Sequence, residues 1–254
     1  MSWNAVILAA GRGRRMGGPK AFMPFGDGTL LGAQLRALQG ASQIAVVVAA
    51  DLWEALSRTD IGAPYGKPLP QERESGLKPL PQERESGLKP LPQERESGLK
   101  PLLQERESGL KPLPQEQVIL VPNPRVEEGP FISIQLGLTA LGRDDPALIV
   151  PVDCPVAPDA PRLLLDAVTS EYAWAAPIHD DRKGHPVLLT ADGRTAALAS
   201  DAGPTLRDLM AATPGVLVPV DSAIIHCNLN TPADRDLFLA EHPSWPDASL
   251  GDSR

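Results

Sequence analysis

Short apolar runs alternate with amphipathic stretches along most of this 254-residue chain, and this alternation restricts the fold more than any other feature. Strand-length apolar runs that are separated by helix-length stretches predict βαβ units and a mainly parallel sheet. We expect strands at residues 5–9, 44–49, 118–121, 147–150, 172–176, 186–189 and 216–220. We expect helices at residues 30–39, 52–58, 132–141, 161–169, 204–211 and 232–241. The order of the strands in the sheet is left open by the sequence.

One segment departs from this pattern. Residues 67–110 contain four copies of the unit KPLPQERESGL, with Leu103 in place of one proline, and a partial copy follows from Lys111. Recurring prolines oppose a continuous helix, and a unit with so few apolar side chains cannot offset the entropy lost on ordering. We therefore expect residues 66–116 to be a mostly extended or disordered insertion, a tandem duplication that the fold tolerates. A proline-rich docking tract is the alternative.

The insertion divides a single predicted domain. Without it roughly 200 residues remain, which suits one domain made of residues 1–65 and 117–242. Residues 243–254 are expected to form a flexible tail. The insertion falls between the second helix and the third strand, whereas ligands of open parallel sheets bind beyond the carboxyl ends of the strands. We therefore expect it to lie away from the active site.

Composition excludes several classes of protein. Lys and Arg number 24 against 32 Asp and Glu, so the net charge of −8 does not favour binding to a nucleic-acid backbone. Cys154 and Cys227 are the only cysteines, and without a CxxC pair they indicate neither a zinc site nor a disulfide framework. The first apolar run is too short for a signal peptide or a membrane span. We expect a soluble cytoplasmic protein with no membrane partner.

The loop after the first predicted strand has the composition of a phosphate-binding loop. Its sequence, AAGRGRRMGGPKAF, contains glycines at 11, 13, 17 and 18 and the cations Arg12, Arg14, Arg15 and Lys20. Glycines let backbone N–H groups approach phosphate oxygens. Met16 breaks the GxGxxG pattern of dinucleotide-binding proteins, and Pro19 and Ala21 around Lys20 break the Walker pattern. The loop therefore follows a different scheme, or it is a glycine-rich surface turn with solvated arginines.

The segment LAAGRGRRMGGPK resembles the LAAGxSxRMGxxK signature of the MobA-like nucleotidyltransferases, which include the enzymes that join CMP or GMP to molybdopterin. Further stretches follow in the matching order: NPRVEEGPFISIQLGL, VPVDCP, GHPVLL, SDAGPTLRDLM and NLNTPAD. The resemblance covers the chain except for the repeat and the C-terminal tail. Gly13 stands where the signature has a serine, so a hydroxyl contact to phosphate is lost there. The family also usually has a shorter connection in place of the repeat.

The resemblance implies a Rossmann-like three-layer α/β/α nucleotidyltransferase fold and a magnesium-dependent reaction. An acceptor phosphate would attack the α-phosphorus of a nucleoside triphosphate and release pyrophosphate. The catalytic residues would be Arg15, Lys20 and Asp153. The nucleotide would be bound by Leu8, Ala9, Ala10, Gly11, Arg12, Gly13, Lys20, Asn123, Gly129 and Ser133. The metal would be held by Asp153 and Asn230, and the acceptor side would include His185 and Asn228.

The positions of these residues suit the chemistry that the resemblance implies, although several of them also have a structural explanation. Asp153 follows an apolar strand, where a carboxylate can hold Mg²⁺ together with substrate phosphates, but aspartate is also common in turns. Thr231 is a predicted helix N-cap, which explains the residues after it but not the amides of Asn228 and Asn230. Capping alone would also explain Ser133. His185 can equally be a turn residue, and Asp201 and Arg207 have the same two interpretations.

Leu8-Ala9-Ala10-Gly11 looks like the cytidine-using members of the family, whereas the guanosine-using members tend to read LAGG. We therefore favour CTP over GTP, with molybdopterin as the acceptor. Transfer to a sugar phosphate or another small alcohol phosphate is an alternative. A nucleotide-binding module without turnover is a third possibility, against which the presence of Lys20, Asp153 and Asn230 argues. Acceptor identity, oligomeric state and any role of the repeat are left open by the sequence.

Overall fold

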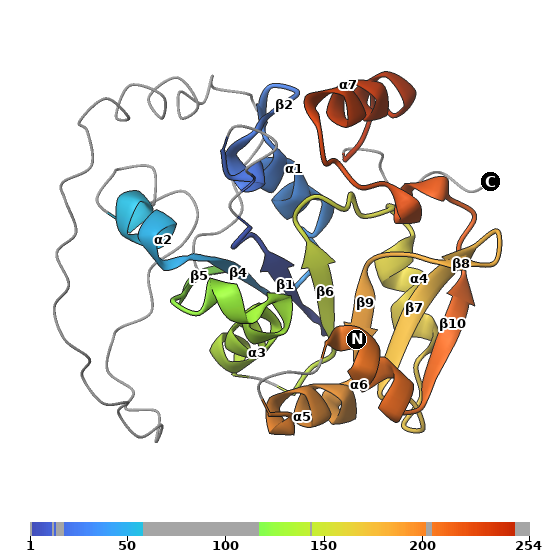
Figure 1. Cartoon of the computed structure of the whole chain (residues 1–254). Helices are drawn as coiled ribbons and strands as arrows, with labels where there is room; N and C mark the ends of the chain where they lie inside the picture. Colours follow the sequence, from blue (N-terminus) through green and yellow to red (C-terminus); the bar gives the residue numbers. More distant parts are fainter. Residues whose placement is uncertain are drawn as a thin grey trace, which may run out of the picture.

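The computed structural model describes residues 2–11, 13, 18–57, 117–142, 144–201 and 205–246. Within these residues the chain forms an eight-stranded sheet in the order β10-β7-β9-β6-β1-β4-β5, with β8 paired to β7 (Figure 1). The strands are β1 Asn4–Leu8, β4 Gln43–Ala49, β5 Val118–Asn123, β6 Ala147–Pro151, β7 Trp174–His179, β8 Arg182–Lys183, β9 Val187–Leu189 and β10 Gly215–Pro219. The repeat lies outside the described residues, so its expected conformation and position stay predictions.

The sheet is mainly parallel, as the sequence predicted. β1 pairs in parallel with β4 and β6, β4 with β5, and β10 with β7. β9 runs antiparallel to both β6 and β7, and β8 runs antiparallel to β7. The carboxyl ends of β1 and β6 are adjacent in the register, with Leu8 opposite Pro151. The loops that leave these two strands therefore start side by side.

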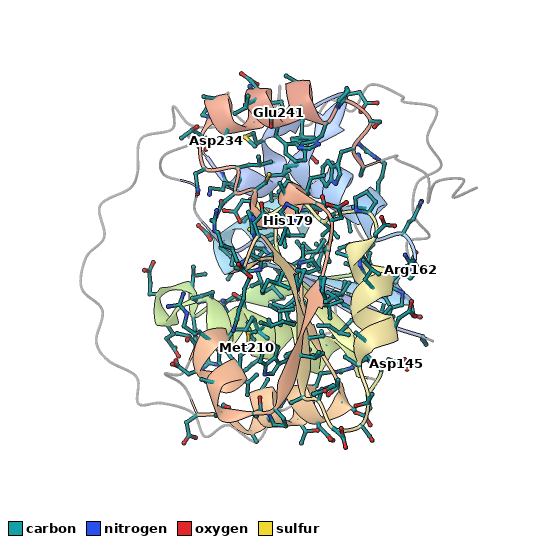
Figure 2. The ribbon with its side chains drawn as sticks, turned by 90° about the vertical axis from the view of Figure 1, so that its right-hand side faces the viewer. Asp145, Arg162, His179, Met210, Asp234 and Glu241 are labelled. Atoms are coloured by element: carbon teal, nitrogen blue, oxygen red, sulfur yellow. The ribbon has the colours of Figure 1, made fainter. Side chains whose placement is uncertain are left out.

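Helices cover both faces of the sheet. α1 Leu30–Ala37, α2 Ala50–Ser57 and α4 Ala160–Ala167 pack on one face, and α3 Pro130–Leu141, α5 Ala191–Ala199 and α6 Leu206–Ala212 pack on the other. Figure 2 shows the sheet from its edge, with Met210 of α6 and Arg162 of α4 on opposite sides. The expected three-layer α/β/α fold is confirmed. In the described part of the chain, no helix combines the length and apolar character needed to cross a membrane.

Alternation along the central strands divides the core between the two faces. Ala5 and Ile7 of β1 belong to the cluster under α1 and α4, whereas Val6 between them belongs to the cluster under α3. Strand β4 alternates in the same way. The cluster under α1 and α4 contains its Ile44, Val46 and Val48, and the cluster under α3 contains its Ala45 and Val47. Successive side chains of a strand point to opposite faces, so a strand that is apolar throughout is buried on both sides. This is the reason why the central strands read as uninterrupted apolar runs.

A third cluster joins the two ends of the described chain. The hairpin of β2 Pro24–Phe25 and β3 Gly28–Thr29 packs against α7 Pro232–Glu241 and the turn that follows it. The ring of Trp245 lies 5.5 Å from that of Phe25 and 5.4 Å from that of Phe238, and its indole N–H donates to the carbonyl of Val156 at 2.8 Å. Burial of this tryptophan fixes residues 243–246. Residues 247–254 lie outside the described residues, so the flexible tail expected there stays a prediction.

Several elements were not predicted. The hairpin β2–β3 and strand β8 are too short to show an alternation of apolar and polar residues. Helix α3 was predicted, but it begins at Pro130 rather than near Ile132. α5 was missed because its sequence, ADGRTAALA, carries a glycine and a β-branched threonine and has little amphipathic character. The helix is fixed instead by its cap, in which the hydroxyl of Thr190 accepts from the amide of Gly193. Gly193 also allows close approach, because a Cβ there would lie 1.9 Å from the carbonyl oxygen of Ala173.

Candidate active site

The glycine-rich loop runs from the end of β1 to a 3-10 helix, η2 Lys20–Phe22, and its described part folds back on itself. Gly13 has a φ of +55°, and a Cβ at this position would lie 1.9 Å from the carbonyl oxygen of Gly18. Only glycine fits both constraints. The glycine that replaces the serine of the family signature is thus required by this backbone.

Lys20 is the cation that this loop brings to the carboxyl end of the sheet. Its ammonium donates to the carboxylate of Asp153 at 2.6 Å and to the side-chain oxygen of Asn230 at 2.7 Å. The side chains of Lys20 and Asp153 are 18% and 20% exposed, so their attraction is only partly screened. Two residues that lie 133 and 210 positions after Lys20 therefore converge on its positive charge.

Asp153 follows β6 and is held by a buried amide from α1. Gln34 is fully buried, and its side-chain N–H₂ donates to the carbonyls of Val152 at 3.1 Å and Cys154 at 2.8 Å. These carbonyls belong to the residues immediately before and after Asp153. The backbone of Asp153 itself accepts from the amide of Leu229 at 2.8 Å. The loop that presents this carboxylate is therefore fixed on three sides.

Asn230 is placed by the cap of α7. The hydroxyl of Thr231 accepts from the amide of Asp234, and the carboxylate of Asp234 accepts from the amides of Thr231 at 2.8 Å and Asn230 at 3.0 Å. Pro232 occupies the first turn, so the predicted N-cap is confirmed. Asn228 is exposed, and its backbone carbonyl accepts from the amide of Asn230 at 3.0 Å.

A cavity of about 360 Å³ opens beside Lys20 and Asp153. It lies between the glycine-rich loop, the end of β6 and the start of α3, and its lining is Leu8, Ala10, Gly11, Gly13, Lys20, Val126, Gly129, Pro130, Ser133, Pro151, Val152 and Asp153. Gly129 has a φ of +98° and precedes Pro130, the first residue of α3. The first N–H groups of a helix have no partner within it and carry a positive partial charge. The cavity thus combines an ammonium with a helix N-terminus, which suits an anion.

The side chain next to Asp153 is not a nucleophile. Cys154 is buried, and this burial, with the neighbouring charge of Asp153, raises the pKa of its thiol to about 12. The thiol therefore stays protonated at neutral pH, and thiolate chemistry is excluded there. Cys154 is instead a small side chain of the packed interior.

The comparisons with known proteins assign this arrangement to a family. The family model for the MobA-like NTP transferase domain matches residues 5–79 and 102–216. The chain belongs to this family. The unmatched interval between the two segments lies inside the repeat. This MobA-like transferase is therefore a nucleotidyltransferase, as the sequence predicted, while no curated protein sequence matches it.

Solved structures share its fold. Molybdopterin-guanine dinucleotide biosynthesis protein A of Archaeoglobus fulgidus is 14% identical with a TM-score of 0.52, over 92% of this chain and 95% of that chain. The 2-C-methyl-D-erythritol 4-phosphate cytidylyltransferase of Thermus thermophilus is 18% identical with a TM-score of 0.53, over 96% and 100%. Rv0371c of Mycobacterium tuberculosis, solved in complex with manganese, is 17% identical with a TM-score of 0.56, over 94% and 99%.

Only some of the residues expected at the site line the cavity of this MobA-like transferase. Leu8, Ala10, Gly11, Gly13, Lys20, Gly129 and Ser133 line the cavity. Arg12 and Arg15 lie outside the described residues. Ala9 and Asn123 are buried and are not part of the lining. The side chain of Asn123 donates to the hydroxyl of Ser133 at 2.9 Å and accepts from the amide of Arg125 at 2.7 Å, so it shapes the turn before α3.

His185 lies on another side of Asp153. It precedes β9, and burial lowers the pKa of its imidazole, although the charge of Asp153 opposes that shift. Its Nδ1 is buried without a hydrogen-bond partner, and its backbone N–H donates to the carbonyl of Ile225 at 2.9 Å. His185 therefore occupies a turn position near Asp153, and its place on the acceptor side stays a prediction.

Sequence reasoning missed Gln34. Its signal was a polar side chain inside an apolar helical stripe, because Gln34 follows Leu30 by four residues and precedes Leu38 by four. It also missed Val126, Pro130, Pro151 and Val152, which line the cavity with apolar atoms that no motif marks. Such lining follows from the adjacency of β1 and β6, which the sequence left open.

Proposed function

We propose that this MobA-like transferase moves a nucleoside monophosphate from a nucleoside triphosphate to a phosphorylated acceptor, with CTP favoured over GTP and molybdopterin as the favoured acceptor. The observation that carries the proposal is the convergence of Lys20, Asp153 and Asn230 beside a cavity that is bordered by the glycine-rich loop and the start of α3. CTP is favoured because Leu8-Ala9-Ala10-Gly11 resembles the cytidine-using members of the family.

The reaction needs neutralisation of charge more than proton transfer. An oxygen of the acceptor phosphate forms a bond to the α-phosphorus, the bond from that phosphorus to the bridging oxygen breaks, and pyrophosphate leaves with the electron pair. Both reactants are anions, so they repel unless cations lie between them. The acceptor phosphate is already ionised, so no general base is required. Lys20 and the N-terminus of α3 would bind the phosphates and stabilise the charge of the leaving pyrophosphate.

The residues at the site fit a divalent cation. One carboxylate and one amide oxygen already converge on a single positive charge, the ammonium of Lys20. Within the described ranges no group of three or more His, Cys, Asp or Glu side chains could hold a metal ion. Mg²⁺ takes one or two protein ligands and completes its shell with phosphates and water, so this carboxylate and amide would suffice to hold it. Asp153 and Asn230 would hold the ion, which would supply charge neutralisation at the α-phosphate.

The test is pyrophosphate release from CTP, GTP, ATP or UTP in the presence of molybdopterin or a sugar phosphate, with and without Mg²⁺. We expect CTP with molybdopterin and Mg²⁺ to give the highest rate. Turnover with the sugar phosphate alone would favour the alternative acceptor, in keeping with the erythritol phosphate of the Thermus thermophilus protein. Nucleotide binding without any turnover would favour a silent binding module.

A single substitution tests the placement of the metal. Asp153→Asn should lower turnover by about a hundredfold or more, because electrostatic stabilisation of the reacting phosphates is lost. Asp159→Asn is the matched control, since Asp159 is exposed in the same connection after β6 and makes no capping hydrogen bond. Equal turnover of the two variants would remove Asp153 from the mechanism.

A further inference from the structure

Two histidines approach each other at the carboxyl end of β7. His179 is the last residue of β7, and His226 is the last residue of the 3-10 helix η7 Ala223–His226. Their ring centroids lie 6.0 Å apart, and both side chains are partly exposed. Figure 2 shows His179 at the end of the sheet that faces α7. The proposed nucleotidyl transfer uses neither imidazole.

Strand β8 holds the two rings in place. Arg182 of β8 is the antiparallel partner of His179, so the two backbones lie side by side. The carbonyl of the same Arg182 lies 2.9 Å from Nε2 of His226. On the other ring, Nδ1 of His179 lies 3.0 Å from the carbonyl of Val220. Each imidazole is therefore fixed at one nitrogen by a backbone carbonyl.

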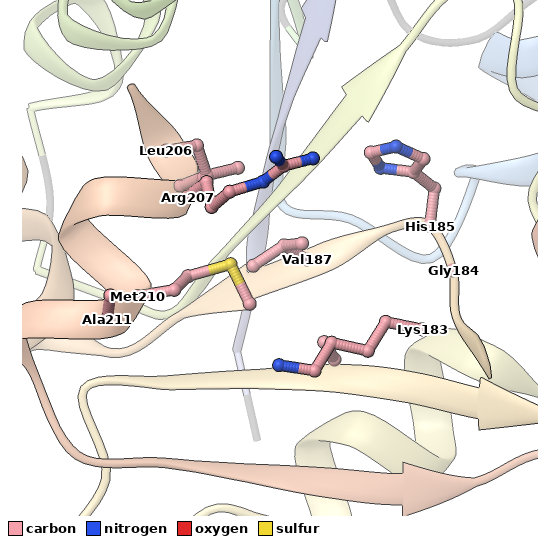
Figure 3. A pocket seen from close by; sticks show the side chains of 9 residues that line it. Lys183, Gly184, His185, Val187, Leu206, Arg207, Met210 and Ala211 are labelled. Atoms are coloured by element: carbon pink, nitrogen blue, oxygen red, sulfur yellow. The ribbon is translucent and has the colours of Figure 1, made fainter. Parts of the chain in front are cut away.

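The backbone of η7 is also fixed against the connection that follows β8. Figure 3 shows this connection, which runs from Lys183 through Gly184 to His185. The N–H of His185 donates to the carbonyl of Ile225 at 2.9 Å, and a Cβ at Gly184 would overlap that same oxygen. This close approach of two backbones requires glycine at 184. It gives His226, which follows Ile225, a defined position beside β8.

The hydrogen bonds of the two rings decide which nitrogens are free to bind a cation. A carbonyl oxygen can only accept, so Nδ1 of His179 and Nε2 of His226 carry the protons. In the neutral imidazoles, Nε2 of His179 and Nδ1 of His226 then hold a lone pair. Histidines that bind metals almost always donate their other ring N–H to a carbonyl, a carboxylate or water. The pair thus has the hydrogen-bonding pattern of metal ligands.

The charges beside the pair favour a cation. Asp180, Asp181 and Arg182 follow His179 in sequence, so these neighbours contribute two negative charges and one positive charge. A carboxylate oxygen of Asp180 lies 3.5 Å from Nε2 of His179. In the neutral ring this nitrogen bears a lone pair, which repels the carboxylate unless a proton or a metal ion lies between them. Water screens this repulsion at the exposed Asp180 but does not reverse its sign.

We infer that His179 and His226 together bind a divalent transition metal ion such as Zn²⁺, and that this ion joins the end of β7 to η7. At the usual metal–nitrogen distance each ring centroid lies about 3 Å from the ion, so two rings can share one ion when their centroids are up to about 6 Å apart. The observed 6.0 Å meets this limit. Two imidazoles leave the remaining positions around the ion to water. Imidazole suits Zn²⁺, whereas Mg²⁺ prefers oxygen ligands, so the site differs in chemistry from the one proposed at Asp153 and Asn230.

This metal site goes beyond the proposed nucleotidyl transfer and does not depend on it. The chain continues from His226 through Asn228 to Asn230, so an ion on the pair would restrain the start of the segment that carries these two amides. An ion that binds the folded chain and not the unfolded chain also stabilises the fold. We therefore expect Zn²⁺ to raise the free energy of unfolding.

The experiment measures binding of Zn²⁺ to the full chain by calorimetry, with Mg²⁺ in excess to occupy oxygen sites. We expect His179→Gln and His226→Gln each to bind Zn²⁺ about tenfold or more weakly than wild type, because one of two imidazole ligands is lost. His242→Gln is the matched control and should keep wild-type affinity, since His242 ends α7 and its ring packs on Phe238 with the centroids 4.7 Å apart.

A second measurement tests whether the two rings share one ion. With Cu²⁺ as the probe, electron paramagnetic resonance should show coupling to two imidazole nitrogens in wild type and to one in His179→Gln or His226→Gln. Denaturant titration should show that Zn²⁺ stabilises wild type more than either variant. The inference is overturned if wild type fails to bind Zn²⁺ in excess Mg²⁺, if either variant keeps wild-type affinity, or if Cu²⁺ couples to a single nitrogen in wild type. Pyrophosphate release is measured separately, and its failure would contradict the proposed function alone.

Discussion

The side-chain amide of Gln34 donates to the carbonyl of Cys154 across 2.8 Å, and this contact ties the middle of α1 to the loop that carries Asp153. A second hydrogen bond, to the carbonyl of Val152, holds the other side of the same loop. The carboxylate on which the proposed chemistry depends is thus positioned by a residue that never contacts the cavity.

We predict that Gln34→Leu destabilises the protein by about 1 to 2 kcal/mol, because two buried carbonyls lose their hydrogen-bond donor. The loss is partly offset, because the substitution also removes the side-chain oxygen of Gln34, which is buried without a partner. The value of kcat should fall about tenfold or more as Asp153 loses its fixed position, with a smaller change in KM for CTP. Denaturant titration and pyrophosphate release measure the two effects. Gln39→Leu, at an exposed position just after α1, should change neither.

Lys20 occupies the oxygens of Asp153 and Asn230 that are proposed to hold the metal. We predict opposite effects of Lys20→Met on two ligands. CTP should bind about tenfold more weakly, because a cation is lost, whereas Mn²⁺ without nucleotide should bind more tightly, because the two oxygens are free. Calorimetry for CTP and electron paramagnetic resonance for Mn²⁺ measure these affinities. Lys183→Met is the control. Weaker binding of Mn²⁺ by Lys20→Met would contradict a metal site that uses the same two oxygens as Lys20.

The stability of the protein should depend on pH through His185. Burial lowers the pKa of this imidazole in the folded chain, so the unfolded chain binds more protons once the pH falls below about 6.5. The free energy of unfolding should therefore fall as the pH drops from about 7 to about 5.5, and this fall should be smaller in His185→Gln. Denaturant titrations at several pH values test this. If the free energy of unfolding depended on pH equally in the wild type and in His185→Gln, His185 would have to stay hydrated in the folded chain.

Gly193 allows α5 to approach the residue before β7. An alanine there would place its Cβ 1.9 Å from a backbone carbonyl, which cannot turn aside as a side chain could. We predict that Gly193→Ala lowers the free energy of unfolding by about 3 kcal/mol. Gly40→Ala, where the nearest atom would lie at 3.4 Å, should have a much smaller effect on the midpoint of denaturation.

The features of the fold that depend on local sequence patterns could be predicted from the sequence. Uninterrupted apolar runs marked the buried strands, and Thr231 with Asp234 marked the start of α7. The sequence could not predict that antiparallel β9 would enter between β6 and β7, because strand order depends on long-range packing. For the same reason it could not show that Gln34 supports Asp153, nor that Asn123 turns inward to Ser133. The role of Asn230 as a metal ligand was proposed only through resemblance to a family, and its contact with Lys20 was not predicted.

The contact between Lys20 and Asn230 also has a consequence for how the protein is made. Lys20 leaves the ribosome about two hundred residues before Asn230 and before Phe238 of α7, whose ring packs on Phe25. A nascent chain can therefore form the sheet before it can complete the hydrogen bonds of the Lys20 ammonium. The capacity to bind nucleotide should arise only after Asn230 has been synthesised, and a product that terminates before α7 would be a folded sheet with an open site.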